Sequence, residues 1–304
     1  MVIHKLKSIL ERRCLILDGA MGTTLSKFKQ RGESCDMLNI SMPEQVQRVH
    51  LEYLNSGSDI ICTNSFMSRG SCLSENLNHL EIEQLNKKSV HIAKRAIEEY
   101  YIKSQEKSDK FVAGVVGPSS DKLPGEVISQ DYASQIRGLI EGGCDIILIE
   151  TVLSSRSLFI ALDEYKKLGV DTPVMISFCV DSNAKLFGGE SLVAVMDLLY
   201  RSKEYYNIFS VGINCGAGID YLKESIIYLS SFTDLCVSFY PNSSSEGDGL
   251  SIMDSKLLLS KMESYLASGL INIVGGCCGT DYRYIKDLRD IVYRYNCRKV
   301  LLNV

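Results

Sequence analysis

Short apolar runs alternate with longer amphipathic stretches along the whole chain, and this alternation constrains the fold more than any other feature. The runs are nearly continuous, as strands covered on both faces should be: 14–18, 59–64, 111–117, 145–150, 174–180, 209–215, 235–242 and 270–278. Eight strands, each followed by a helix, within 304 residues predict an α/β fold, a (β/α)8 TIM barrel. The alternative is a doubly wound open sheet, but no Gly-x-Gly-x-x-Gly follows the first run.

Helical patterns fill the intervals between these runs. We expect helices at 44–55, 75–103, 130–141, 154–168, 191–205, 221–230, 254–267 and 282–293. Several end at glycine, the usual stop signal, as at Gly57, Gly169 and Gly269. Because no linker interrupts the alternation, we expect one domain over 1–304, with its core at about 14–292.

Composition excludes several classes of protein. A net charge of −4 and a pI near 5.7 argue against a nucleic-acid partner. No run approaches the roughly 20 apolar residues of a membrane span, and the first one is too short for a signal peptide. We therefore expect a cytoplasmic protein whose eleven cysteines are reduced, serving as metal ligands, catalytic groups or core filler.

The turn that follows the last apolar run contains two adjacent cysteines, Cys277 and Cys278, among three glycines. Glycine costs roughly 1 kcal/mol in a helix interior relative to alanine, so this stretch is a poor helix. It suits a tight turn that brings backbone and thiols toward one point, as a soft metal requires. The alternative is that both cysteines are small buried hydrophobes.

Barrel active sites form at the carboxyl ends of the strands, and a third cysteine, Cys215, ends the sixth run. The barrel would bring it to Cys277 and Cys278, where three thiolates could hold one Zn2+ per chain and leave a fourth position open. Such a site suits activation of a substrate thiol, and hence alkyl transfer to sulfur. No lysine or histidine ends a predicted strand, which argues against Schiff-base chemistry and a histidine base.

Carboxylates and amides make up the rest of the predicted mouth. Glu150 ends a wholly apolar run and needs a partner, for which the ammonium of an amino-acid substrate is suitable. Asp18 either caps the following turn or binds substrate. Asn64, Asn214 and Asn242 either orient substrate or satisfy loop backbone.

Together these motifs resemble the homocysteine S-methyltransferase family, from about Cys14 to Val292. The motifs that carry the resemblance, in order, are Asp18-Gly19-Ala20-Met21-Gly22-Thr23, Thr63-Asn64-Ser65-Phe66, Gly117-Pro118, Ile149-Glu150-Thr151, Gly212-Ile213-Asn214-Cys215, Pro241-Asn242 and Gly275-Gly276-Cys277-Cys278-Gly279-Thr280. Within the family, the chain looks most similar to the homocysteine-binding domain of cobalamin-dependent methionine synthase.

The resemblance implies zinc on Cys215, Cys277 and Cys278, with L-homocysteine as the exchangeable fourth ligand and methionine as product. It implies Glu150 at the substrate amino group, the Asp18-Gly19 turn in the same pocket, and Asn242 near the zinc when substrate is absent. We also expect Asn64, Thr151 and Asn242 to bind substrate.

The methyl donor stays open. Pro241-Asn242 is followed by Ser243-Ser244-Ser245-Glu246 where relatives tend to have Ala-Gly, and the loop from Ser119 to Gly125 is short. No folate-binding or cobalamin-binding module is present in these 304 residues. We therefore expect methylcobalamin only on a separate corrinoid or methyltetrahydrofolate methyltransferase partner. The alternatives are S-methylmethionine or betaine as donor, another thiol as acceptor, or a non-catalytic zinc- and thiol-binding protein.

Overall fold

The predicted barrel is present in the structure, a computed structural model that describes residues 2–73, 77–243 and 253–299. All neighbouring strands pair in parallel, in the order β1-β8-β7-β6-β5-β4-β3-β2. A further bridge between Leu17 and Ile60 links the two ends of this sheet, so that the strands surround a common axis. The strands are β1 (Leu15–Ile16), β2 (Ile60–Cys62), β3 (Phe111–Val116), β4 (Ile146–Val152), β5 (Val174–Phe178), β6 (Ile208–Asn214), β7 (Cys236–Tyr240) and β8 (Ile273–Val274).

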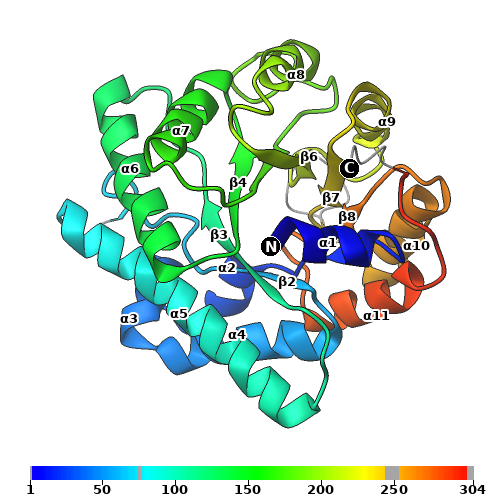
Figure 1. The fold of residues 1–304 in the computed structure, drawn as a ribbon, viewed down its shortest axis with the longest axis horizontal. Helices are drawn as coiled ribbons and strands as arrows, with labels where there is room; N and C mark the ends of the chain where they lie inside the picture. The colour runs from blue at the N-terminus through cyan, green and yellow to red at the C-terminus, as the bar shows by residue number, and fades with distance from the viewer. Residues whose placement is uncertain (1, 74–76, 244–252, 300–304) are drawn as a thin grey trace.

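Helices surround the strands on all sides in Figure 1. The helices that follow strands β1 to β8 in turn are α4 (Pro43–Ser56), α5 (His79–Ser104), α6 (Gly125–Gly142), α7 (Ser155–Lys167), α8 (Leu192–Arg201), α9 (Lys223–Phe232), α10 (Ser255–Ala267) and α11 (Tyr282–Val292). Two short helices, α2 (Met21–Leu25) and α3 (Leu38–Ser41), and the 3-10 turn η1 (Cys35–Met37) lie between β1 and α4.

Continuous apolar strands arise because both faces of the sheet are covered. Alternate strand residues such as Ile147 and Ile149 pack outward against the helices. The others, including Ile146 and Leu148, fill the barrel interior. Every residue of β3 is buried, as the uninterrupted run at 111–117 predicts.

One helix without a predicted counterpart, α1 (Val2–Leu10), lies across the barrel in Figure 1. Its buried residues Leu6, Ile9 and Leu10 belong to the same cluster as the interior strand residues, so α1 closes the amino-terminal end of the barrel. Their spacing is the helical signal that our strand-based analysis did not use. No described helix combines the length and apolar character needed to cross a bilayer.

Predicted helix ends differ from the structure in three places. Helix α6 begins five residues before the predicted start, directly after Pro124, and α8 ends at Arg201 rather than at 205. Helix α5 begins at His79, where Asn78 forms a capping box with Glu81; the predicted start at 75 lies outside the described residues. Side-chain hydrogen bonds mark two of these ends, from Asn78 at the start of α5 and from Ser202 at the end of α8, whereas α6 begins after Pro124 without a side-chain cap.

Candidate active site

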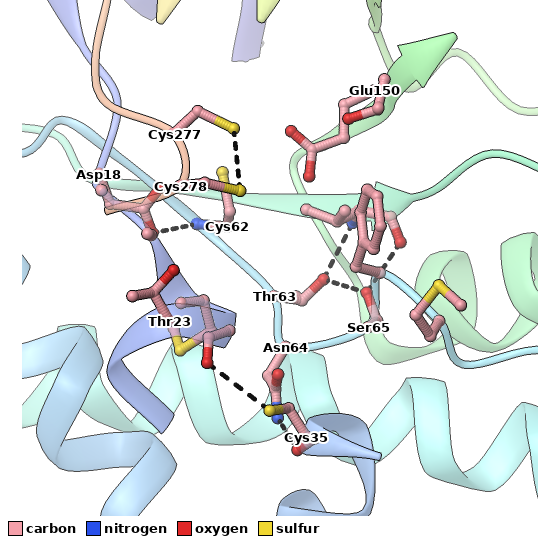
Figure 2. Close-up of a pocket in the computed structure, with 18 of the residues that line it drawn as sticks. Asp18, Thr23, Cys35, Cys62, Thr63, Asn64, Ser65, Glu150, Cys277 and Cys278 are labelled. Atoms are coloured by element: carbon pink, nitrogen blue, oxygen red, sulfur yellow. Dashed lines mark hydrogen bonds between the residues drawn. The ribbon is translucent and has the colours of Figure 1, made fainter. Parts of the chain in front are cut away.

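A cavity of about 490 Å3 lies at the carboxyl ends of the strands. Its walls come from the residues that follow β1 and β2 and from the ends of β4, β6, β7 and β8. Figure 2 shows the thiols of Cys277 and Cys278 and the carboxylate of Glu150 pointing into this pocket. Predicted site residues that lie far apart in the sequence therefore line one cavity.

The three predicted metal ligands converge. The Sγ atom of Cys278 lies 3.6 Å from that of Cys215 and 4.0 Å from that of Cys277. All three Sγ atoms lie within 4.8 Å of one another. Thiolates bound tetrahedrally to zinc at about 2.3 Å are roughly 3.8 Å apart, so the cluster has the size and the soft donor atoms that zinc requires.

The three thiols of the cluster differ in acidity: the pKa of Cys278 is lowered, and those of Cys215 and Cys277 are raised. Two hydrogen bonds lower the pKa of Cys278, and the one with Cys215 has a larger effect than the one with Cys277. Hydrogen bonds with Cys215 and Cys278, followed by burial, raise the pKa of Cys277. One thiolate is thus stabilised by two neighbouring thiols, as expected of a site prepared for a cation.

Glycines shape the turn that carries Cys277 and Cys278, as predicted. Gly279 has a φ of +82°, a left-handed conformation in which a side chain is strained. The turn is closed by Thr280, whose backbone N–H and hydroxyl both donate to the carbonyl of Cys277, at 3.0 and 2.8 Å. Its conformation therefore fixes where both thiols point.

Two carboxyl groups lie in the cavity without a basic partner. Glu150 and Asp18 form no ion pair with any described residue, and Asp18 is only 3% exposed. Burial, followed by the charge of Asp18, raises the pKa of Glu150 to about 8, while the neighbouring Tyr240 hydroxyl opposes this rise. Burial likewise raises the pKa of Asp18 to about 7. Both groups would be stabilised by a cation entering the cavity.

The structure argues against one of the two roles considered for Asp18, the capping of the following turn. Helix α2 begins after Ala20 without a side-chain cap, so the capping role is wrong. Instead, Asp18 Oδ2 accepts a 2.8 Å hydrogen bond from the backbone N–H of Cys62. This bond ties the end of β1 to the end of β2 and holds the carboxylate at the cavity wall.

The remaining predicted site residues divide into two groups. Gly19, Asn64 and Thr151 line the cavity. The Asn64 amide donates to the Cys35 carbonyl at 2.8 Å and to Asn39 Oδ1 at 3.3 Å. Both of its donor hydrogens therefore bond to neighbouring protein groups. Asn242 is not among the described lining residues; its side chain donates to the Gly216 carbonyl at 3.3 Å. Residues 244–246, where the sequence departs from its relatives, lie outside the described residues.

Several lining residues were not predicted. Cys62 lies beneath Asp18, and Asp36 accepts from the N–H of Met67 at 3.0 Å. Lys29 also lines the cavity, from the loop after α2, so the absence of lysine from the strand ends does not exclude lysine from the mouth. Its exposed ammonium donates to the Glu33 carbonyl at 2.9 Å, whereas a Schiff-base lysine is normally desolvated. Lys29 and Asp36 follow no strand directly, and only Cys62 has a sequence signal, its place at the end of β2.

Comparisons with known proteins identify a family and similar folds. Residues 15–292 match the family described as homocysteine S-methyltransferase. The apo form of the homocysteine methyltransferase MmuM from Escherichia coli is 25% identical, with a TM-score of 0.76, and the match covers 94% of this chain and 99% of that chain. The metallated form of the same enzyme is 24% identical, with a TM-score of 0.80 and the same coverage.

Proposed function

The chain belongs to the homocysteine S-methyltransferase family, and from this premise we propose that it transfers a methyl group to the thiol of L-homocysteine, giving L-methionine. The observation that carries the proposal is the pairing, within one cavity, of a three-thiol cluster and two carboxyls without basic partners. A zwitterionic amino acid with a terminal thiol presents the complementary groups.

We propose that Cys215, Cys277 and Cys278 hold one zinc ion, because their spacing and donor atoms fit it. Zinc bound there would lower the pKa of a substrate thiol that joins it. The protein's own groups would hold the other end of the substrate: Glu150, with Asp18 beside it, accepts from the ammonium. Because that cation favours the ionised form of Glu150, substrate binding releases a proton from a group whose pKa is about 8 in the free protein.

The proposed methyl transfer forms one bond and breaks one bond. The homocysteine sulfur, having lost its proton to solvent, forms a bond to the methyl carbon. The bond between that carbon and the donor breaks, and its electron pair stays on the donor. The apolar side chains of Leu17, Met21 and Val115 line the same cavity and limit the access of water to the reacting sulfur.

For the donor, we propose a methyl group carried on the corrinoid of a separate protein, which would make this chain the homocysteine-activating component of a methionine synthase system. Large apolar side chains are exposed on the connections that leave the carboxyl ends of the strands: Ile40 at 50%, Phe187 at 65% and Tyr221 at 53%. Exposed apolar side chains at the end of the barrel that carries the cavity suit contact with a protein surface.

A small sulfonium or quaternary ammonium donor, such as S-methylmethionine or betaine, is the second candidate. A pocket for such a cation usually has aromatic walls. Two aromatic side chains, Phe66 and Tyr240, are among the described residues that line the cavity, and Tyr240 adjoins Glu150. The donor assay below distinguishes the two candidates.

The test is to offer the zinc-loaded protein homocysteine with methylcobalamin, S-methylmethionine or betaine in parallel, and to measure methionine by mass spectrometry. We expect methionine with at least one donor, and its loss in C277A. C297A is the matched control, since Cys297 donates to the Leu10 carbonyl at the closed end of the barrel. Full activity of C277A would refute the proposal. Binding of zinc with no methionine from any donor, and with no homocysteine sulfur joining the metal, would also refute it, because that combination is expected of a non-catalytic zinc protein.

A further inference from the structure

Two residues of the cavity adopt a left-handed backbone conformation without being glycine. Thr151 has a φ of 56° and Cys215 a φ of 52°. For a β-branched residue such as threonine this conformation is an outlier, which persists only where its surroundings impose it. Asn214 supplies that constraint, because it precedes Cys215 in the chain and forms hydrogen bonds with Thr151.

Asn214 contacts both Thr151 and the thiol cluster. Its Oδ1 accepts from the backbone N–H of Thr151 at 3.0 Å, and its Nδ2 donates to Thr151 Oγ1 at 2.8 Å. The same Nδ2 lies 3.8 Å from Cys277 Sγ. Asn214 is fully buried, and Cys215 follows it directly. A side-chain amide is suited to this place because it accepts and donates at once.

The conformation of Thr151 determines the direction of its neighbour, Glu150. The register between β4 and β5 shifts between Ile149 and Val152, at the two residues Glu150 and Thr151. Irregularities of this kind re-aim a side chain near an active site. The hydrogen bonds from Asn214 therefore act on the strand segment that presents the Glu150 carboxylate to the cavity.

We propose that Asn214 is a positioning residue that sets the separation between the Glu150 carboxylate and the thiol cluster, and thereby selects for the length of the substrate chain. This inference rests on the proposed function, in which one substrate molecule engages both groups. Homocysteine and cysteine differ by one methylene between the thiol and the ammonium. A fixed separation lets only one of them reach both ends.

The test measures binding rather than turnover, with cobalt(II) in place of zinc, because a thiol that joins cobalt changes its visible absorption. Dissociation constants are compared for homocysteine, for cysteine, and for 4-mercaptobutanoate, which lacks the amino group. Wild type is expected to prefer homocysteine over both. In N214A, the ratio of dissociation constants for cysteine and homocysteine, and that for 4-mercaptobutanoate and homocysteine, should each fall by about tenfold or more. A loss of this size is expected when a binding group is misplaced. N183A, at an exposed site outside the cavity, is the matched control and should keep both preferences.

A rescue separates positioning from a general structural role. Glycine adopts a positive φ without strain, so T151G should hold the local conformation with less help from Asn214. The preferences lost in N214A should therefore be partly regained in the N214A/T151G double variant. Retention of both preferences by N214A, or no recovery in the double variant, would overturn the inference while leaving the proposed function intact. A wild type with no preference for homocysteine over 4-mercaptobutanoate would instead refute the proposed role of Glu150, and the inference with it.

Discussion

Replacing Glu150 by glutamine tests the amine-binding end of the site, because the change preserves the shape of the side chain and removes its charge. Glu150 lines the cavity and forms no ion pair with a described residue, so the substrate ammonium would be the cation that hydrogen-bonds to it. Removing one partner of a hydrogen-bonded charge pair costs ~2–5 kcal/mol. E150Q should therefore weaken homocysteine binding strongly.

The pKa of Glu150 refines this magnitude. Because burial raises the pKa to about 8, ionising the carboxyl at pH 7 costs ~1.4 kcal/mol, which wild type must supply from its own binding energy. The net loss in E150Q at pH 7 is then ~1–4 kcal/mol, or roughly fivefold to several-hundred-fold in affinity. At pH 6 ionising the carboxyl costs about another 1.3 kcal/mol while the substrate ammonium stays protonated, so the difference between wild type and E150Q should be up to about tenfold smaller than at pH 7.

Titration calorimetry of the zinc-loaded proteins with homocysteine and with 4-mercaptobutanoate measures this difference directly. The large loss should occur with homocysteine and be nearly absent with the analogue, which has no ammonium. An equal loss with both ligands would show that Glu150 acts on something other than the amino group. A difference that stays constant between pH 6 and pH 7 would contradict the raised pKa of Glu150.

Three further predictions concern the site without substrate. Zinc at a thousandfold excess over its dissociation constant should stabilise the protein by about 4 kcal/mol in thermal unfolding, and C215A should abolish this effect; an unchanged zinc effect in C215A would exclude Cys215 as a ligand. G279A should destabilise the protein by about 2–4 kcal/mol in urea unfolding, because Gly279 has a positive φ and an added Cβ would collide with Ser243. Its control, G169A, has a positive φ in open space and should cost only about 1 kcal/mol; equal costs would show that the collision has no effect. The metal-free protein should lose stability as pH rises from about 4 to about 8. Burial raises the pKa of Asp18 to about 7 and that of Glu150 to about 8 in the folded protein. The unfolded chain therefore releases these two protons at lower pH than the folded protein does, which favours unfolding. E150Q should flatten the upper part of that loss in urea midpoints, and an unchanged pH dependence would contradict the assignment.

The barrel and its thiol cluster could be predicted from the sequence because both depend on strong, ordered signals. Continuous apolar runs mark strands buried on both faces, and the order of the strands then places Cys215 beside the turn with Cys277 and Cys278. Glu150 could be predicted because a carboxylate ending an apolar run requires a partner.

The contacts that set geometry within the site could not be predicted in the same way. The left-handed conformation of Thr151 depends on an asparagine 63 residues away, and no local preference of threonine indicates it. The role of Asp18 depends on the backbone of Cys62 across two strands. Lys29 reaches the cavity from a loop whose path has no hydrophobic period. Tertiary hydrogen bonds and loop paths are fixed by packing after the strands are in place.

X-ray absorption at the zinc edge, with and without homocysteine, tests the central claim most directly, because it counts the sulfur atoms bound to the metal. The account predicts zinc bound to three sulfur atoms and a lighter ligand in the resting protein, and to four sulfur atoms at about 2.3 Å once homocysteine is added. A first shell that does not change on adding homocysteine would contradict it.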